Sequence, residues 1–145
     1  MKLAMGADHG GYSLKEILKK HLVEAGHEVL DLGTHDTDSC NYPDYAAKVA
    51  YAVADKEAVL GILVCGTGIG MSIAANKVKG IRCVVCSDPY SAQLSRMHND
   101  TNVIAIGARV IGPEMAKMIL KLWLETEFEG GRHSRRVDMI NRLDD

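Results

Sequence analysis

The sequence predicts an α/β fold of three layers, in which helices cover both faces of a five-stranded parallel sheet. Short apolar runs, three of them rich in Val and Ile, recur along the chain, as in strands that are buried on both faces. Amphipathic helical patterns lie between them. Strict alternation of strands and helices is typical of a parallel sheet with right-handed crossovers. With 145 residues, of which 47% are hydrophobic, the chain can bury one substantial core.

The strands are expected at the apolar runs 3–7, 28–32, 60–65, 81–86 and 103–106. The first helix is expected to begin at Ser13, a capping candidate with Glu16 three residues later, and to end at Gly26. The second helix follows Pro43 over residues 46–54. Further helices are expected over residues 71–78, 89–97 and 113–128.

A charged segment, residues 132–145, follows the glycine pair Gly130–Gly131. Its few apolar residues include a helical spacing, so the segment needs a surface to pack on. The glycine pair is the only internal boundary that the sequence indicates. We therefore expect one domain over residues 1–145, with residues 129–145 as a C-terminal arm.

Composition argues against several classes of partner. The formal net charge is -2, and a single Trp and a single Phe offer little for stacking on bases, so we expect no nucleic-acid partner. No apolar stretch approaches the ~20 residues of a membrane span, and the N-terminus lacks a signal-peptide core. The sequence predicts a cytoplasmic protein with no membrane partner.

The four cysteines do not indicate a disulfide framework, which belongs to small secreted domains. Cys83 and Cys86 have the spacing of a redox or zinc motif, but on a strand their odd separation directs the two sulfurs to opposite faces. We therefore expect two buried strand cysteines in a reducing compartment.

In parallel sheets, ligands bind beyond the carboxyl ends of the strands. The loop after the third strand, Cys65 to Gly70, has the sequence CGTGIG, and its backbone amides can hold a negative charge at the start of a helix. Sharper templates fail: a dinucleotide fingerprint needs glycine where Met71 stands, no Lys-Ser or Lys-Thr follows for a P-loop, and no arginine closes a phosphatase loop. The loop predicts an anion site for something other than a nucleotide triphosphate.

Cys65 itself allows two interpretations. A thiol at a strand end beside a helix N-terminus is a competent base or nucleophile. Free cysteines are also commonly buried, so Cys65 could be only the last core residue of the strand. Spacing alone leaves both interpretations open.

Three further pairs of residues are candidates. Asp8–His9 ends the first strand, either as a ligand-contacting pair or as a cap with a structural histidine. His98–Asn99 follows the fourth helix, where a helix C-terminus would stabilise a protonated imidazole. Arg132 and Arg136 share one helix face and can grip a phosphate, although solvated arginines are the commoner case.

No residue spacing predicts a metal site, so we expect catalysis without a metal or other cofactor. A zinc site made of Cys65, His9 and His98 is the least favoured alternative, because a zinc-bound thiolate is a poorer base.

Five motifs, taken together and in this order, resemble the ribose-5-phosphate isomerase B family, which also includes galactose-6-phosphate isomerase subunits. They are GADHGG (6–11), NYPDY (41–45), CGTGIGMSIAANK (65–77), SAQLSR with HND (91–96 and 98–100) and EGGRH (129–133). The resemblance implies a Rossmann-like sheet and the interconversion of ribose 5-phosphate and ribulose 5-phosphate through a cis-enediolate. It also implies a homodimer with active sites at the subunit interface, and leaves open whether dimers pair into tetramers.

By similarity, the catalytic residues are Cys65, which moves the proton between C1 and C2, Thr67, which supports it, and His98, which opens the sugar ring. The resemblance implies further substrate-binding residues: the amides of Gly66, Thr67, Gly68, Ile69 and Gly70 at the enediolate oxygen, and Asp8, His9, Tyr42 and Asn99 at the sugar. It also implies a phosphate clamp of Arg132 and Arg136, with Arg109 close by.

One position separates two branches of this family. Some members lack the cysteine and use a glutamate shortly after the glycine loop, where Met71 stands here. The chain is therefore expected to belong to the cysteine branch, with its C-terminal helix extending to a dimer partner. Two alternatives remain: isomerisation of a six-carbon substrate, allose 6-phosphate or galactose 6-phosphate, and a non-catalytic sugar-phosphate sensor.

Overall fold

Five parallel strands form one sheet in a computed structural model that describes residues 1–145. They are β1 (Lys2–Ala7), β2 (Glu28–Asp31), β3 (Leu60–Cys65), β4 (Cys83–Val85) and β5 (Val103–Gly107). Their order in the sheet is β2-β1-β3-β5-β4, and every neighbouring pair is parallel. β3 therefore lies at the centre, where all of its residues are buried. The predicted five-stranded parallel sheet is confirmed.

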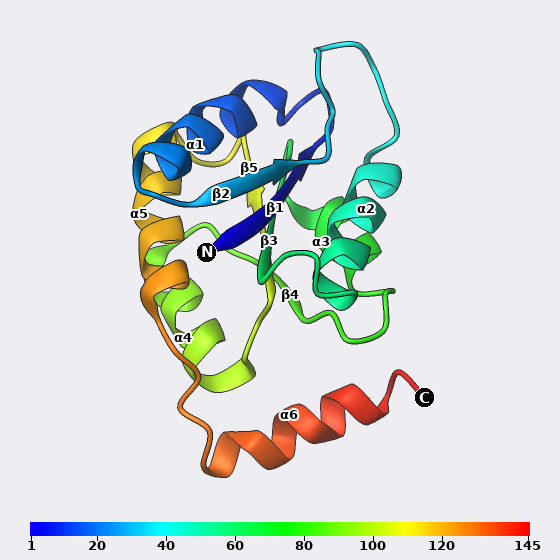
Figure 1. The fold of residues 1–145 in the computed structure, drawn as a ribbon, viewed down its shortest axis with the longest axis vertical. Helices are drawn as coiled ribbons and strands as arrows, with labels where there is room; N and C mark the ends of the chain where they lie inside the picture. The colour runs from blue at the N-terminus through cyan, green and yellow to red at the C-terminus, as the bar shows by residue number, and fades with distance from the viewer.

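Six helices complete the fold. They are α1 (Tyr12–Glu24), α2 (Tyr42–Ala54), α3 (Ile69–Ala75), α4 (Pro89–Asn99), α5 (Pro113–Glu125) and α6 (Arg132–Arg142). Helices α1, α4 and α5 cover one face of the sheet, and α2 and α3 cover the other (Figure 1). Each face has its own buried cluster, so the predicted three layers are confirmed. None of the six helices has both the length and the hydrophobicity to cross a membrane.

The packing of α2 depends on two glycines of the sheet. A Cβ atom on Gly6 of β1 would lie 2.8 Å from Val49, and one on Gly61 of β3 would lie 2.7 Å from the same side chain. Both distances are too short for a real contact, so only glycine allows α2 to approach this closely. The close approach holds the start of α2, with Tyr42, near the carboxyl edge of the sheet.

Two predicted boundaries were wrong for reasons that involve side chains. Ser13 does not cap the first helix, because α1 begins one residue earlier and its N-cap is Gly11. Asp8 accepts a hydrogen bond from the Gly11 amide at 3.0 Å, so a side chain from the end of β1 orders this turn instead. The fourth strand is shorter than expected because the Arg82 amide bonds to the side chain of Asn102, outside the strand ladder.

Other ends differ by a few residues. α3 covers Ile69–Ala75 instead of 71–78, and α5 ends at Glu125 instead of 128. α4 continues through His98 and Asn99, which form its last turn and do not follow it.

Cys83 and Cys86 lie on opposite faces of the sheet, as predicted. Cys86 is buried in the cluster under α1, α4 and α5, whereas Cys83 packs against the cluster under α2 and α3. Burial raises the pKa of Cys83 to about 12 and that of Cys86 to about 11. Both groups are therefore neutral, unreactive thiols at physiological pH.

A buried ion pair ties α1 to the second strand. Lys15 is fully buried, and its Nζ donates to both carboxylate oxygens of Asp31, at 2.7 and 2.8 Å, and to the Thr34 carbonyl at 2.7 Å. Burial works against the charged form of Asp31, but hydrogen bonds from Lys15, the Gly33 amide and Lys19 together lower its pKa to about 2. The pair orders the chain that leads from β2 into the loop before α2.

Replacing Lys15 with methionine is expected to lower the free energy of unfolding by about 3 kcal/mol at pH 7, because it leaves a largely buried carboxylate without its main partner. Because the pKa of Asp31 is depressed in the folded protein, its charge stabilises fully above about pH 4, and this contribution is lost as the pH falls through about 2. Urea unfolding followed by the fluorescence of the buried Trp123 measures the change, with exposed Lys20→Met as the matched control. Equal losses in both variants would contradict the assignment.

Candidate active site

Cys65 and Asp8 lie side by side at the carboxyl edge of the sheet. They follow the paired residues Ala7 and Val64 of β1 and β3, and the Asp8 amide donates to the Val64 carbonyl at 3.3 Å. The Cys65 side chain belongs to the cluster on the α2 and α3 side of the sheet. Both side chains are buried, with 5% of Cys65 and 9% of Asp8 exposed. The edge thus carries a shielded thiol next to a carboxyl group.

The glycine loop wraps around the Cys65 sulfur. Gly68 has a φ of +81°, a left-handed conformation that favours glycine, and its amide donates to Cys65 Sγ at 3.1 Å. The Ile69 amide is also used, because it donates to Thr67 Oγ1 at 3.2 Å. The amides of Gly66, Thr67 and Gly70 make no hydrogen bond within the chain. Of the five predicted amides, these three are thus open to an anionic oxygen.

Arg109 and Tyr42 flank this loop on either side. A Cβ atom on Gly66 would lie 3.3 Å from Nη1 of Arg109, and one on Gly70 would lie 2.6 Å from the Tyr42 ring. The Tyr42 ring leaves no room for a side chain at position 70, whereas the flexible Arg109 side chain can shift away from one at position 66. The structure therefore places a cation and a phenol beside Cys65.

His9 lies at the same edge and holds the loop before α2. Its Nδ1 accepts a hydrogen bond from the Cys40 amide at 3.2 Å. These residues together are called the thiol group below: Asp8, His9, Tyr42, Arg109 and the Cys65–Gly70 loop. The name denotes this set of residues and not the SH group of Cys65 alone. All of them come from segments that follow carboxyl ends of strands, as the parallel topology predicts.

The remaining predicted residues gather elsewhere. His98 and Asn99 form the last turn of α4, and Arg132 and Arg136 lie on the first turns of α6; these four residues are called the arginine group below. The rings of His98 and His133 stack with their centroids 4.3 Å apart. His133 was not among the predicted site residues, and its neighbouring position to Arg132 in the EGGRH motif is the only sequence signal that could have indicated it.

The two groups lie at opposite edges of the sheet. α4 starts after the carboxyl end of β4 and runs back, so its last turn lies near Asn102, whose carbonyl accepts from the Gly61 amide at the start of β3. β3 spans six residues, or about 20 Å, between the two edges. Figure 1 shows α6 below the sheet, with the loops after β1 and β3 above it. One chain therefore does not bring Cys65 together with His98, nor Arg109 with Arg132 and Arg136.

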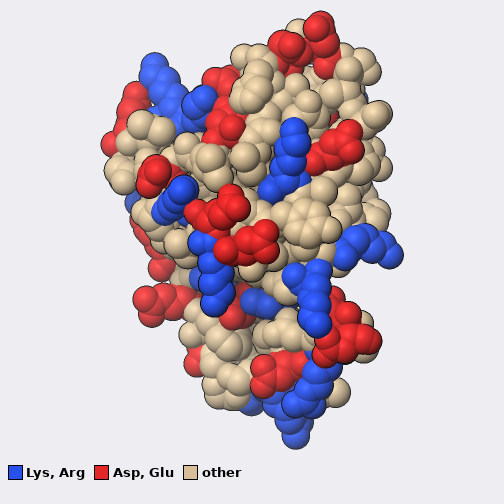
Figure 2. Space-filling view, turned by 45° about the vertical axis from the view of Figure 1, so that its right-hand side comes forward, with Lys and Arg blue, Asp and Glu red and all other residues tan.

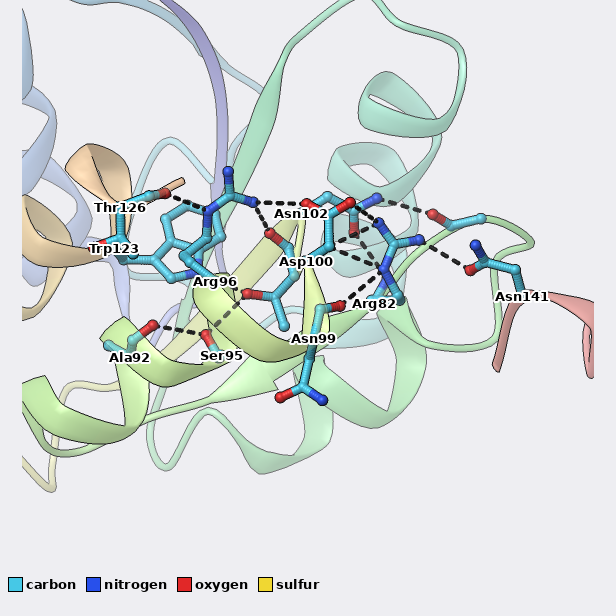
Figure 3. A network of polar contacts seen from close by, with 12 residues as sticks. Arg82, Ala92, Ser95, Arg96, Asn99, Asp100, Asn102, Trp123, Thr126 and Asn141 are labelled. Carbon is cyan, nitrogen blue, oxygen red and sulfur yellow. Dashed lines mark hydrogen bonds and ion pairs between the residues drawn. The ribbon is translucent and has the colours of Figure 1, made fainter. Parts of the chain in front are cut away.

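A polar network fixes the end of α4 (Figure 3). Arg82 donates to the carbonyls of Asn99 and Asp100, at 3.2 and 2.9 Å, and through Nη1 to Asn141 of α6 at 3.0 Å. Arg96 lies over the Trp123 ring and pairs with Asp100 at 3.6 Å. Asp100 ends the helix with a φ of +47°. No sequence pattern predicted this network, although Asp100 directly follows His98–Asn99 in the HND motif.

The alternative zinc site of Cys65, His9 and His98 does not form within the chain, because His98 lies at the other edge of the sheet. On the face shown in Figure 2, Lys and Arg side chains lie on the lower lobe that α6 forms, with Asp and Glu side chains among them, and both signs of charge also mix over the rest of this face.

A family model described as Ribose/Galactose Isomerase matches residues 3–140, a stretch that includes both the thiol group and the arginine group. The chain belongs to the ribose/galactose isomerase family. Ribose-5-phosphate isomerase B of Escherichia coli (strain K12) is 58% identical to it over 143 residues, which cover 99% of this chain and 96% of that protein. This chain, as a member of the family, thus carries the thiol group and the arginine group on one polypeptide, at opposite edges of its sheet.

Two further members of this family are similar to the chain over nearly its whole length. D-erythrulose-4-phosphate isomerase of Pectobacterium atrosepticum is 48% identical, over 97% of this chain and 93% of that protein. The solved structure of Clostridium thermocellum ribose-5-phosphate isomerase B matches with a TM-score of 0.98 at 51% identity, over 99% of this chain and 97% of that chain. The ribose/galactose isomerase fold therefore extends over the whole chain, α6 included.

Proposed function

We propose that this chain is an aldose–ketose isomerase that interconverts ribose 5-phosphate and ribulose 5-phosphate through a cis-enediolate, without a metal or other cofactor. The 58% identity to a ribose-5-phosphate isomerase B supports the substrate class. The observation that carries the chemistry is the buried Cys65 thiol, whose sulfur the Gly68 amide holds at 3.1 Å beside loop amides that have no partner in the chain.

In this proposal Cys65 moves a proton between C1 and C2 of the open-chain sugar. A positioned general base contributes about a hundredfold to ten-thousandfold to the rate. The proton is only weakly acidic, so the negative charge that develops on the sugar oxygen needs stabilisation as well. The amides of Gly66, Thr67 and Gly70 are placed to donate to it, and a preorganised donor is worth about 3 to 4 kcal/mol. Thr67 supports the loop through its bond to the Ile69 amide.

The other roles follow the same assignment. His98 opens the furanose ring by proton transfer before isomerisation, and Asp8, His9, Tyr42 and Asn99 contact the sugar hydroxyls. Arg132 and Arg136 grip the phosphate, whose charge suits a bidentate guanidinium. Arg109, beside the thiol group, adds a further cation.

We propose that two copies of the chain form a homodimer in which the thiol group of one meets the arginine group of the other. In a two-fold symmetric dimer, a contact between the thiol group of one copy and the arginine group of the other occurs twice, which yields two complete sites. Exposed apolar side chains flank both groups, as an interface requires. They are Ile69, Ile73, Val85 and Val110 near the glycine loop, and Met139, Ile140 and Leu143 on α6.

The proposed dimer also accounts for the position of the C-terminal segment. α6 packs mainly on α4 and leaves much of its apolar surface exposed. We propose that residues 1–145 form one sugar-phosphate isomerase domain and that residues 129–145 are an arm which reaches the partner's site.

The proposed function leaves open how many carbon atoms the preferred sugar phosphate has. The relative named D-erythrulose-4-phosphate isomerase shows that family members act on other sugar phosphates, and six-carbon phosphates such as allose 6-phosphate remain the alternative. Turnover on four-, five- and six-carbon aldose phosphates, assayed with a chelator present, tests the proposal. We expect ribose 5-phosphate to give the highest kcat/KM. Tight binding of all of them with no turnover would instead indicate a sensor.

A further inference from the structure

Three potential metal ligands meet where α4, the Gly130–Gly131 turn and α6 join. One ligand atom each from His98, Glu129 and His133 lies within 4.8 Å of the other two. His133 Nε2 and Glu129 Oε2 are 3.7 Å apart, and the two imidazole rings are stacked with an angle of 13° between their planes. No role in the proposed reaction accounts for Glu129 or His133.

The backbone builds this cluster. The Glu129 amide donates to the carbonyl of Met97, the residue before His98, at 3.1 Å. Gly130 and Gly131 then adopt positive φ values of +68° and +56° and turn the chain, so that α6 starts at once and carries His133 back over His98. The three side chains are thus held together by a hydrogen-bonded turn that needs its two glycines.

His133 is short of a partner in this cluster. Its Nε2 is buried and makes no hydrogen bond, which is costly for a polar atom unless another group satisfies it. A bound cation would satisfy this nitrogen.

We propose that His98, Glu129 and His133 bind one divalent cation of the zinc class. Two imidazole nitrogens with one carboxylate oxygen are a donor set typical of zinc sites that keep a position open, whereas magnesium and calcium prefer oxygen ligands. Tetrahedral bonds of about 2.0 to 2.1 Å place donor atoms about 3.4 Å apart, so donor atoms that now lie within 4.8 Å of one another must approach by up to roughly 1.4 Å. The lone pairs of an imidazole lie in its ring plane, so the partly buried His98 must also rotate out of its stack on His133 before both rings can bind one ion, while the half-exposed Glu129 turns toward them.

The charges around the cluster limit the affinity. Glu129 contributes the only negative charge among the ligands, and Arg132 and Arg136 oppose a cation. We therefore expect weaker binding than at a structural zinc site. One consequence rests on the proposed function: a bound cation occupies the His98 nitrogen needed for ring opening, so it inhibits the isomerase reversibly.

Titration of the full-length protein with Co²⁺, the spectroscopic probe for zinc, tests the site. We expect one equivalent per chain by equilibrium dialysis, with a visible absorption band of histidine and carboxylate ligation. Glu129→Gln and His133→Asn should each weaken binding by at least about tenfold, since even outer-shell changes cost 10- to 100-fold. Glu127→Gln, an exposed glutamate two residues away, is the matched control and should bind as the wild type does.

Equal Co²⁺ affinity in all four proteins would overturn the proposal, as would a thiolate-to-cobalt charge-transfer band, which would place the ion at a cysteine. Inhibition by Zn²⁺ that a chelator reverses, and that Glu129→Gln abolishes, would support the functional consequence. The Co²⁺ measurements need no turnover. A chain that binds Co²⁺ as described but isomerises nothing would contradict the proposed function and leave the metal site standing.

Discussion

Replacing Cys65 with alanine is expected to lower kcat for ribose 5-phosphate by about a hundredfold to ten-thousandfold, because the general base is lost. The fold should survive, since the change removes one sulfur atom at the edge of the sheet. The loop amides and the arginines remain, so the affinity for the sugar phosphate should change much less than kcat. A coupled assay of ribulose 5-phosphate formation measures the effect.

Cys40→Ala is the control for this variant. Cys40 is the other cysteine near the thiol group, with its sulfur 3.8 Å from Nδ1 of His9, but it has no role in proton transfer. Its replacement should leave kcat within a few-fold of the wild type. Normal turnover by Cys65→Ala would show that another residue is the base. A second readout is exchange of the substrate C2 proton with deuterated solvent, which should stop in Cys65→Ala.

Removing both clamp arginines, Arg132→Ala with Arg136→Ala, is expected to lower kcat/KM by at least about a hundredfold, since a hydrogen bond to a charged group is worth about 1.5 to 3 kcal/mol. Part of the loss should fall on kcat. Binding energy at the phosphate positions the sugar over Cys65, so it contributes to the transition state as well as to affinity.

Arg142→Ala is the matched control for the clamp. Arg142 lies on the last turn of α6, six residues and about 9 Å along the helix axis beyond Arg136, so its loss should change kcat/KM little. Ribose without its phosphate provides a second control. Wild type and the double variant should be equally slow with it, because neither can use a phosphate contact that the substrate lacks. A double variant that kept full activity on ribose 5-phosphate would contradict the clamp.

The three inner strands, β1, β3 and β5, were predictable because they are almost fully buried and have nearly continuous apolar sequences; β3, at the centre, begins and ends where its apolar run does. The starts of the helices were harder to predict. Ser13 has the pattern of a cap, but the Asp8 side chain accepts from the Gly11 amide and the helix begins directly after Gly11. α4 ends two residues beyond its predicted end. Its end is held by Arg82, which lies just before β4, and by Arg96, which lies within α4 itself.

The division of the site into two groups follows from topology. Every residue of the thiol group lies at the end of a strand, in the loop that follows a strand or at the start of the next helix, and such positions share the carboxyl edge of a parallel sheet. His98 ends a helix that runs antiparallel to the strands, so it must lie at the other edge. The stacking of His98 on His133 was not predictable, because it depends on the positive φ angles of two consecutive glycines.

Mixing two inactive variants tests most directly whether each active site is shared between two chains. Cys65→Ala lacks the base, and the Arg132→Ala, Arg136→Ala double variant lacks the clamp. In a mixed dimer of the two, one site loses both groups, while the other combines an intact Cys65 from one chain with intact arginines from its partner. If equal amounts are unfolded and refolded together, random pairing is expected to restore about a quarter of wild-type activity. Activity that stayed at the level of the separate variants, in mixtures shown to contain mixed dimers, would contradict a site built from two copies.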